Sequence, residues 1–309
     1  MKRIRIGIVG VGKIARDQHI PALRSNSAFD LVAIASRTAR VEGLANFRTI
    51  EEMLDGRLDL DAVTICTPPH VHYEAARTAL RRHKHVCLEK PPCATTEQLS
   101  HLAHLATQMD RTLFQTWHAR HAGAVDAAQR WLSTRSVRKG SIVWKEDVRK
   151  WHPGQTWIWQ AGGFGVFDAG INAVSILSKI VAGPIFVSAA QLFIPSNCEA
   201  PIAANVTFTT DTGAMIDAVF DFRHTGEPSW GIQIETGQGE LNLTAHGNKL
   251  SIDGTSVASG TSDAEYPSVY RRFADLIPRR ESEVDKRPFQ LVADIFLIAR
   301  RSIVEPFVE

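Results

Sequence analysis

Short apolar runs alternate with amphipathic segments along the first third of the chain. The apolar runs are rich in β-branched residues, as strands are, and occupy 4–10, 30–36, 61–67, 85–90 and 112–116. Helix-like segments lie between them at 13–25, 50–55, 70–83 and 95–108. Strands that alternate with helices predict a parallel sheet covered on both faces. Pro21 lies inside the first helix, and because proline lacks an N–H donor we expect a kink or a break there.

From about residue 120 onward, strands follow one another closely. A helix at 121–134 and a strand at 140–149 lead into a loop rich in Gly and Trp, and another helix starts near Asp168. Further strands are predicted at 185–194, 204–210, 214–222, 230–236, 239–245 and 249–252. The turns between them are too short for crossover helices, so this sheet should be mainly antiparallel. Helices at 267–277 and 288–303 close the chain.

A chain of 309 residues is long enough for two domains, and the change of pattern places the boundary near residue 120. We therefore predict an α/β domain with a doubly wound parallel sheet over 1–120. An α+β domain with a mostly antiparallel sheet follows over 121–309.

Composition excludes several classes of function. The net charge is only +2, and the one short basic cluster, 135–139, is not the stripe that nucleic-acid binding needs. No apolar run reaches the length of a membrane span, and the N-terminus is typical of a first strand rather than a leader. The four cysteines form no CxxC pair, and Cys66 and Cys87 lie in apolar runs, as buried free thiols do. We expect a cytoplasmic protein that binds neither nucleic acid nor membranes.

The sharpest motif is the segment Gly10-Val11-Gly12-Lys13-Ile14-Ala15, which follows a strand and opens a helix. This is the context of the G-x-G-x-x-G/A dinucleotide fingerprint, in which Gly10 permits a tight turn and Gly12 lets the backbone approach a pyrophosphate. The helix N-terminus then offers N–H groups and a positive dipole end to the phosphates. The motif predicts a dinucleotide site.

The end of the second strand selects the cofactor. NAD-selective sites carry a carboxylate there, whereas this chain has Ser36-Arg37-Thr38. A guanidinium binds a 2′-phosphate that a carboxylate would repel, so we expect NADP to be preferred. Ser36 is small and neutral and does not exclude NAD.

Two further strand ends carry candidate chemistry. One gives Thr67-Pro68-Pro69-His70 and the next gives Glu89-Lys90-Pro91-Pro92, at the sheet edge where ligands of α/β proteins bind. A lysine near the nicotinamide and partly buried has a lowered pKa, which suits it to proton transfer. Asp168 and Asn172 lie one helical turn apart and should share a face, and we predict that Lys90, Asp168 and Asn172 are catalytic.

These motifs together resemble the glucose–fructose oxidoreductase/inositol dehydrogenase family over essentially the whole chain. The resemblance rests on GVGKIA, the Thr67-Pro68-Pro69 loop, Glu89-Lys90-Pro91 and GG…D-x-G-x-N. It implies a Rossmann domain followed by a domain with an open, mostly antiparallel sheet that often forms dimer contacts. It also implies that Lys90 is catalytic or orients the substrate, and it allows a cis Lys90–Pro91 peptide. Many members place a histidine at the position of Asn172, and because asparagine cannot exchange a proton near neutral pH, either Lys90 or Asp168 must act as the base.

Within that family, TWHAR, WKEDVRKWHPGQTWIW and GVFDAGIN are most similar to bacterial aldose 1-dehydrogenases that act on L-arabinose or D-galactose. Sugar sites combine aromatic faces with polar groups, and Trp residues cluster before the glycine loop. The predicted sugar-binding residues are His118, Arg120, Glu146, Trp151, His152, Trp157, Asp168, Asn172 and Trp230.

The complete set of predicted cofactor-binding residues is Gly10, Gly12, Lys13, Ile14, Ser36, Arg37, Thr38, Thr67, Pro68, His70, Glu89, Lys90 and Trp117. No HExxH or paired-cysteine motif is present, so we expect no metal. The expected activity is NADP-dependent oxidation of an aldose to its lactone by a homo-oligomer, a dimer that forms through the sheet of the second domain. Two alternatives remain: an NAD-dependent glycosidase on the same fold and a non-catalytic NADP sensor.

Overall fold

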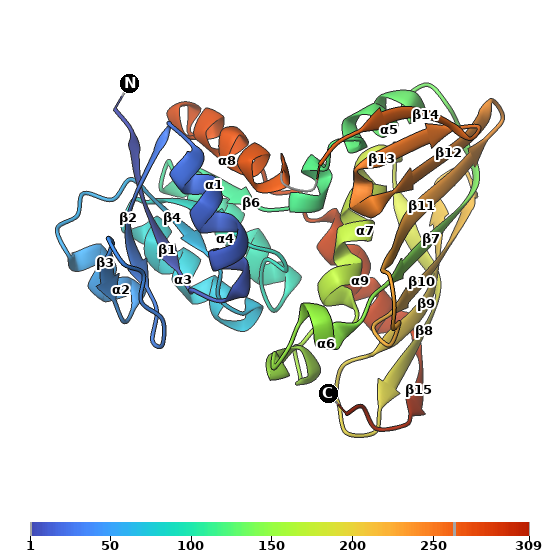
Figure 1. Cartoon of the computed structure of the whole chain (residues 1–309), viewed down its shortest axis with the longest axis horizontal. Helices are drawn as coiled ribbons and strands as arrows, with labels where there is room; N and C mark the ends of the chain where they lie inside the picture. Colours follow the sequence, from blue (N-terminus) through green and yellow to red (C-terminus); the bar gives the residue numbers. More distant parts are fainter. Residues whose placement is uncertain (1, 262–263, 309) are drawn as a thin grey trace. The chain divides into compact units, whose positions relative to one another are not determined.

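The computed structural model describes residues 2–261 and 264–308, which fall into two compact units (Figure 1). The first unit holds the residues up to Trp117 together with Tyr266–Lys286, and the second holds His118–Glu265 together with Arg287–Glu309. The division expected from the sequence, 1–120 and 121–309, differs from this grouping chiefly at 266–286. That segment returns to the first unit because one face of its helix is apolar and is buried there.

The first unit is built on a parallel sheet of six strands in the order β3-β2-β1-β4-β5-β6. This is the strand order of a Rossmann fold, with the order reversing beside β1. The strands are β1 (Ile4–Val9), β2 (Phe29–Ala35), β3 (Ala45–Phe47), β4 (Ala62–Ile65), β5 (His85–Leu88) and β6 (Leu113–Gln115). Five of the six were predicted, and β3 was missed because three half-buried residues carry too short a pattern.

The helices of the first unit follow the predicted segments closely. They are α2 (Ile50–Asp55), α3 (Pro69–Arg81), α4 (Thr96–Gln108) and α8 (Glu265–Leu276), the last of which begins one residue before the unit boundary. The helical segment predicted at 13–25 is interrupted as expected at Pro21. A π-helical stretch, η1 (Ala15–His19), is followed by α1 (Ile20–Ser25), which has Pro21 in its first turn. Because proline has no N–H to donate, it fits the start of a new helix better than the interior of a continuous one.

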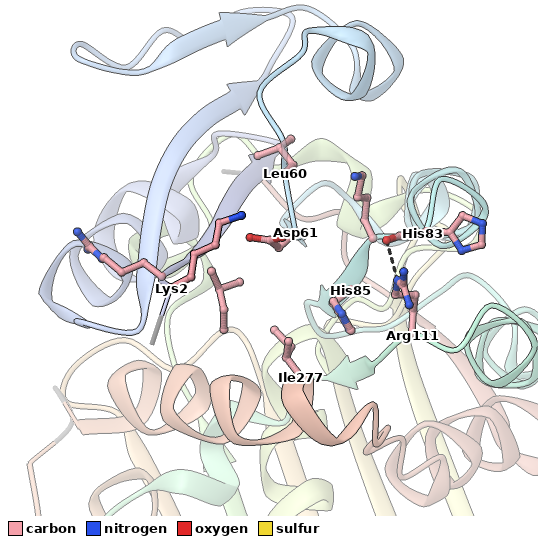
Figure 2. Close-up of a pocket in the computed structure, with 10 residues that line it drawn as sticks. Lys2, Leu60, Asp61, His83, His85, Arg111 and Ile277 are labelled. Atoms are coloured by element: carbon pink, nitrogen blue, oxygen red, sulfur yellow. Dashed lines mark hydrogen bonds between the residues drawn. The ribbon is translucent and has the colours of Figure 1, made fainter.

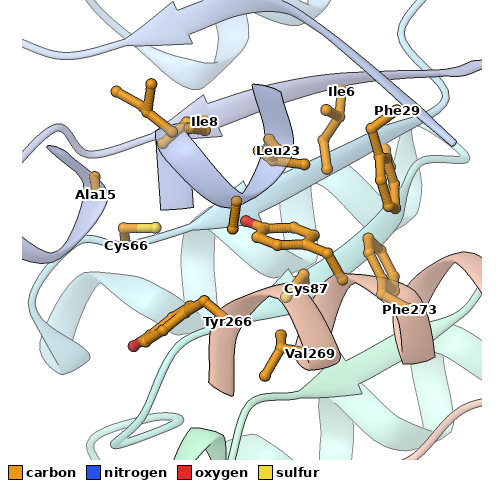
Figure 3. Packing of buried hydrophobic residues seen from close by; sticks show 14 of the residues in the cluster. Ile6, Ile8, Ala15, Leu23, Phe29, Cys66, Cys87, Tyr266, Val269 and Phe273 are labelled. Atoms are coloured by element: carbon orange, nitrogen blue, oxygen red, sulfur yellow. The ribbon is translucent and has the colours of Figure 1, made fainter. Parts of the chain in front are cut away.

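The apolar core of the first unit lies where α8 meets the sheet (Figure 3). Phe273 of α8 stacks on Phe29 with ring centroids 6.0 Å apart and on Phe114 at the same distance. Cys66 and Cys87 lie in this core as free thiols, as predicted, and burial raises the pKa of Cys87 to about 12. The Lys90–Pro91 peptide is cis, as the resemblance allows.

The second unit is built on a sheet of nine strands in the order β14-β13-β12-β11-β7-β10-β9-β8-β15 (Figure 1). Its strands are β7 (Val137–Lys145), β8 (Ile185–Pro195), β9 (Ala203–Thr210), β10 (Met215–Asp221), β11 (Ser229–Thr236), β12 (Gly239–Thr244), β13 (Lys249–Ile252), β14 (Thr255–Ser259) and β15 (Arg300–Val304). Neighbours are antiparallel except for the β7–β10 and β8–β15 pairs, so the prediction of a mainly antiparallel sheet is confirmed.

The helices of the second unit are α5 (Val125–Leu132), α6 (Val148–Trp151), α7 (Phe167–Ile180) and α9 (Arg287–Ile298). Helix α7 is buried on nearly every side, as its mostly apolar sequence requires. It starts within one residue of the predicted position near Asp168.

Two predicted elements in the second unit end earlier than expected. The strand predicted at 140–149 stops at Lys145, because the Asp147 side chain accepts a hydrogen bond from the Arg149 N–H and caps α6 instead. The helix predicted at 288–303 stops at Ile298, and residues 300–304 pair with β8 as the edge strand β15. Periodicity alone did not show this change, because short apolar runs suit either element.

No helix within residues 2–261 and 264–308 has both the length and the apolar character needed to cross a bilayer.

We predict that Phe273→Ala destabilises the protein by about 3–5 kcal/mol, because a fully buried ring that stacks on two others leaves a cavity. Urea denaturation measures the free energy of unfolding. The matched control is Leu297→Ala on the exposed side of α9, where the side chain is 81% exposed and the effect should stay within about 0.5 kcal/mol. A loss below about 1 kcal/mol for Phe273→Ala would contradict the role of α8 in the first core.

Candidate functional site

The turn after β1 is shaped by two glycines. Gly10 has a φ of +87°, and a Cβ atom there would come within 2.8 Å of the Thr67 backbone nitrogen, so glycine is required. A Cβ atom on Gly12 would meet nothing within 4 Å, so the backbone at that position borders open space. Open space beside a helix start is what a phosphate group needs. The residues present therefore fit a dinucleotide at this turn.

The next predicted residues begin the helix at 13–25. Lys13 forms an exposed ion pair with Asp17 one turn later. The half-buried Ile14 side chain packs against the core, so only its backbone is available to a cofactor. Ala15 is fully buried, as close packing of helix and strand requires.

The end of β2 carries the residues expected to choose between NAD and NADP. The buried Ser36 hydroxyl accepts a hydrogen bond of 3.1 Å from the Ala39 N–H and so closes a tight turn. Arg37 and Thr38 project from this turn and are exposed. Since Arg37 is exposed, its guanidinium is accessible to a phosphate from solvent.

The loop after β4 presents one unsatisfied polar atom. Thr67 Oγ1 is buried and has no hydrogen-bond partner among the described residues, which is uncommon for a hydroxyl and suits contact with a ligand. His72 lies buried beneath this loop and its Nε2 donates to the Thr67 carbonyl. Burial lowers the pKa of His72 to about 4. Pro68 precedes α3 and is half-buried, and His70 is exposed on the first turn of that helix.

The end of β5 carries Glu89, which is predicted to bind the cofactor. That side chain is only 3% exposed, and Oε2 accepts a hydrogen bond of 2.8 Å from the Lys90 N–H. Glu89 therefore holds the backbone of the loop, while the half-buried Lys90 follows it. Trp117 is also buried, and its Nε1 donates to the Asp285 carbonyl at 2.9 Å.

The strands β2, β1, β4 and β5 are parallel neighbours, so the four strand ends described above meet at one edge of the sheet. A separate cavity of about 420 Å³ opens at the opposite, amino-terminal edge of the sheet (Figure 2). Figure 2 shows Asp61, His85 and Arg111 around it, and burial together with Arg111 lowers the pKa of His85 to about 4. None of the predicted site residues lines this cavity.

The second unit brings four predicted sugar-binding residues together. The Glu146 side chain, just past β7, accepts a hydrogen bond of 2.8 Å from Trp230 Nε1. His152 Nε2 lies 3.7 Å from Glu146 Oε1, and His152 Nδ1 lies 3.5 Å from Asp168 Oδ2. We call Glu146, His152, Asp168 and Trp230 the acidic–aromatic cluster. Its imidazole lies between two buried carboxyl groups, an arrangement that can hold and move protons.

Asn172 shares the buried face of α7 with Asp168, one turn away. Asn172 Oδ1 is buried and has no hydrogen-bond partner among the described residues. A buried amide oxygen without a partner is costly, and a sugar hydroxyl would satisfy it. The sequence prediction that Asp168 and Asn172 lie on one face therefore agrees with their placement.

The remaining aromatic residues divide into two groups. Trp151 is 37% exposed and its ring lies 5.6 Å from that of Trp230, so both can offer a face to a sugar. Trp157 is half-buried in the short helix η3 (Thr156–Trp159), and no ring contact joins it to the acidic–aromatic cluster among the described residues.

Two predicted hydroxyl ligands bind protein groups in the second unit. The Arg120 guanidinium donates to the Ser175 carbonyl at 2.8 Å and to Ser178 Oγ at 2.9 Å, so it ties its segment to α7. His118 Nδ1 bonds Glu265 Oε2 at 2.7 Å.

Glu265 and His246 were missed by sequence reasoning. Burial opposes ionisation of Glu265, but hydrogen bonds from His118 and His246 lower its pKa to about 2. The His246 ring lies 5.2 Å from that of Trp230, next to the acidic–aromatic cluster. Its backbone has a φ of +60° between two other residues of positive φ, a strained arrangement typical of functional segments. No motif in the sequence marks it.

The comparisons with known proteins agree with this architecture. The model of the family described as "Oxidoreductase family, NAD-binding Rossmann fold" matches residues 4–116. Galactose 1-dehydrogenase from Pseudomonas fluorescens is 44% identical over 307 residues, which are 99% of each chain. The crystal structure of D-galactose-1-dehydrogenase from Rhizobium etli is 49% identical, with a TM-score of 0.94 over 100% of this chain and 99% of that one.

The structure of a 3-ketoreductase from Actinomadura kijaniata, solved with NADP and TDP-benzene, shares the fold. It is 20% identical, with a TM-score of 0.84 over 98% of this chain and 100% of that one. Because the identity to galactose 1-dehydrogenase extends through both units, the chain belongs to the oxidoreductase family with an NAD-binding Rossmann fold, the glucose–fructose oxidoreductase/inositol dehydrogenase family that its motifs resemble.

Proposed function

We propose that this protein is an NADP-preferring aldose 1-dehydrogenase that oxidises D-galactose, L-arabinose or both to the aldonolactone. One observation carries the proposal. The 44% identity with galactose 1-dehydrogenase covers the second unit as well as the first, and the second unit holds the acidic–aromatic cluster. A likeness confined to the Rossmann unit would support only nucleotide binding.

The first unit would hold the cofactor. The backbone at Gly10 and Gly12 would bind the pyrophosphate, and Arg37 would bind the 2′-phosphate bidentately. Thr67 Oγ1, which is buried without a partner among the described residues, would gain one on binding. The nicotinamide, when bound, supplies the acceptor for the hydride that leaves the anomeric carbon.

The second unit would hold the sugar and prepare it for oxidation. Asn172 Oδ1 would accept a hydrogen bond from a hydroxyl group, and Trp151 and Trp230 would cover an apolar face of the ring. Asp168 would accept the proton of the anomeric hydroxyl, and His152 beside it would stabilise the carboxylate or pass the proton onward. Lys90 is the alternative base.

We also propose that the protein is a homodimer assembled through the sheet of the second unit. Phe186 of β8 and Met215 of β10 are both paired with Thr209 of β9 and so lie in one row of the sheet. These two apolar side chains are 56% and 59% exposed. Exposed apolar groups in one row of an open sheet favour contact with a second copy.

Turnover of free aldoses tests the proposed dehydrogenase activity directly. Purified protein with NADP⁺ should show rising absorbance at 340 nm with D-galactose or L-arabinose, and a weaker rise with NAD⁺. No signal with any aldose would overturn the dehydrogenase proposal. Release of sugar from a glycoside without net NADPH would instead indicate the glycosidase, and cofactor binding without any turnover would indicate the sensor.

Arg37→Ala should raise the KM for NADP⁺ by about 10-fold to 100-fold, the equivalent of one charge-assisted interaction, and leave the KM for NAD⁺ nearly unchanged. Arg24→Ala is the matched control, because Arg24 is also exposed but lies at the end of α1. Equal changes for both cofactors would remove Arg37 from cofactor selection.

Asp168→Ala should lower kcat by roughly 10²-fold to 10⁴-fold, the usual contribution of a general base, while the dissociation constant for NADP⁺ stays the same. Asp126→Ala is the control, since Asp126 is an exposed acid in the same unit that pairs with Lys179. An unchanged kcat would exclude Asp168 as the base and leave Lys90 in that role.

A further inference from the structure

A carboxyl group is buried in the first unit beside the proposed catalytic lysine. Glu89 follows β5 directly, precedes Lys90 and is 3% exposed. Carboxylates are almost never buried to this extent unless they are paired or hydrogen-bonded. The hydrogen-bond partners of the Glu89 carboxyl group therefore indicate its role.

Each carboxyl oxygen of Glu89 accepts hydrogen bonds from a different part of the unit. Oε1 accepts from the Tyr266 hydroxyl at 3.0 Å and contacts His19 Nε2 at 3.1 Å. Oε2 accepts from the Lys90 N–H at 2.8 Å. One side of the carboxyl group thus faces α8 and η1, and the other holds the backbone of the residue that carries the amine.

A second layer of hydrogen bonds orients the imidazole. His19 Nδ1 lies 2.7 Å from the Tyr270 hydroxyl, and that hydroxyl lies 3.0 Å from Thr64 Oγ1. One set of roles satisfies every group: Thr64 donates to Tyr270, Tyr270 donates to Nδ1, and Nε2–H donates to Glu89. Burial raises the pKa of Tyr270 well above its usual value, so this phenol remains a donor.

These side chains come from segments far apart in the sequence. His19 lies on η1, Glu89 follows β5, and the two tyrosines, Tyr266 and Tyr270, lie on α8. Figure 3 shows Tyr266 in the packed cluster that α8 makes with the sheet. A core that needed only packing would be served by apolar side chains of the same size, because a buried polar network adds little net stability. A network directed at one backbone N–H instead supplies geometric precision.

We propose that Glu89, His19 and Tyr266 are positioning residues that fix Lys90 for its reaction with the sugar. The inference rests on the proposed function, in which Lys90 is the alternative base. Glu89 fixes the position of the Lys90 backbone. The side chain of Glu89 is in turn held by Tyr266 and His19, and Tyr270 acts one step further away because it orients His19.

The test uses phenol-to-phenyl substitutions, which remove one hydroxyl and keep the ring. Tyr266→Phe should lower kcat by about 10-fold or more, because small displacements of a reacting group are costly, while the KM for the sugar and the dissociation constant for NADP⁺ change little. Tyr270→Phe should have a smaller effect of the same kind. Tyr73→Phe is the matched control, since its hydroxyl bonds His101 on the exposed side of α3 and α4.

A second pair of variants tests the imidazole and provides a rescue. His19→Gln keeps an N–H donor for Glu89 and should retain most of the activity, whereas His19→Leu removes the donor and should lose at least as much as Tyr266→Phe. Equal losses for His19→Gln and His19→Leu would overturn the proposal, because they would show that only the shape of the site matters.

Amide hydrogen exchange at Lys90 is the readout that does not depend on turnover. In protein labelled with ¹⁵N-lysine, exchange of the Lys90 N–H should accelerate in Tyr266→Phe and His19→Leu and stay unchanged in Tyr73→Phe. Unaltered exchange in both variants would overturn the positioning role. If the wild-type protein oxidises no aldose, the proposed function fails, and the exchange experiment still decides whether this network holds Lys90 in place.

Discussion

The burial of the Glu89 carboxyl group is the constraint on which the first unit depends. A carboxyl group in an apolar interior must be satisfied by donors that its own strand cannot supply. His19 and Tyr266 supply them, one from the π-helical stretch after the glycine turn and the other from α8. The segment Tyr266–Lys286 lies in the first unit through its buried apolar helix face, although almost 150 positions separate it from the rest, and it also supplies one of these donors. Its helix contributes the tyrosines to the network and Phe273 to the core.

The second unit has the opposite arrangement, because its polar groups gather where we propose that the sugar binds. Pairing of β7 with β11 puts Trp144 opposite Trp230, and the adjoining loop brings Glu146 to the Trp230 N–H. His152 then bridges the distance to Asp168 on α7. Asn172 Oδ1 has no partner among the described residues, and a ligand hydroxyl that donates to it would satisfy this buried atom.

Sequence reasoning succeeded wherever a local pattern had a local cause. The glycine turn, the break at Pro21 and the start of α7 near Asp168 follow from backbone conformations and hydrogen-bond donors that only a few residue types can supply. It could not show pairings between residues that are distant in the sequence. Arg120 was predicted to bind sugar hydroxyls, and its guanidinium binds the Ser175 carbonyl and the Ser178 hydroxyl, a pairing that no spacing along the chain reveals.

By itself, the sequence determined most of the order of strands and helices, the dinucleotide turn and the absence of a carboxylate after the second strand, because each depends on residues close together in the chain. Only the tertiary structure decided that Glu89 faces inward, that His246 lies beside Trp230 and that residues 300–304 form an edge strand. Those outcomes depend on which distant groups satisfy buried polar atoms and which apolar faces meet. Such pairings carry no periodic signal along the chain, so they are settled only when the segments pack.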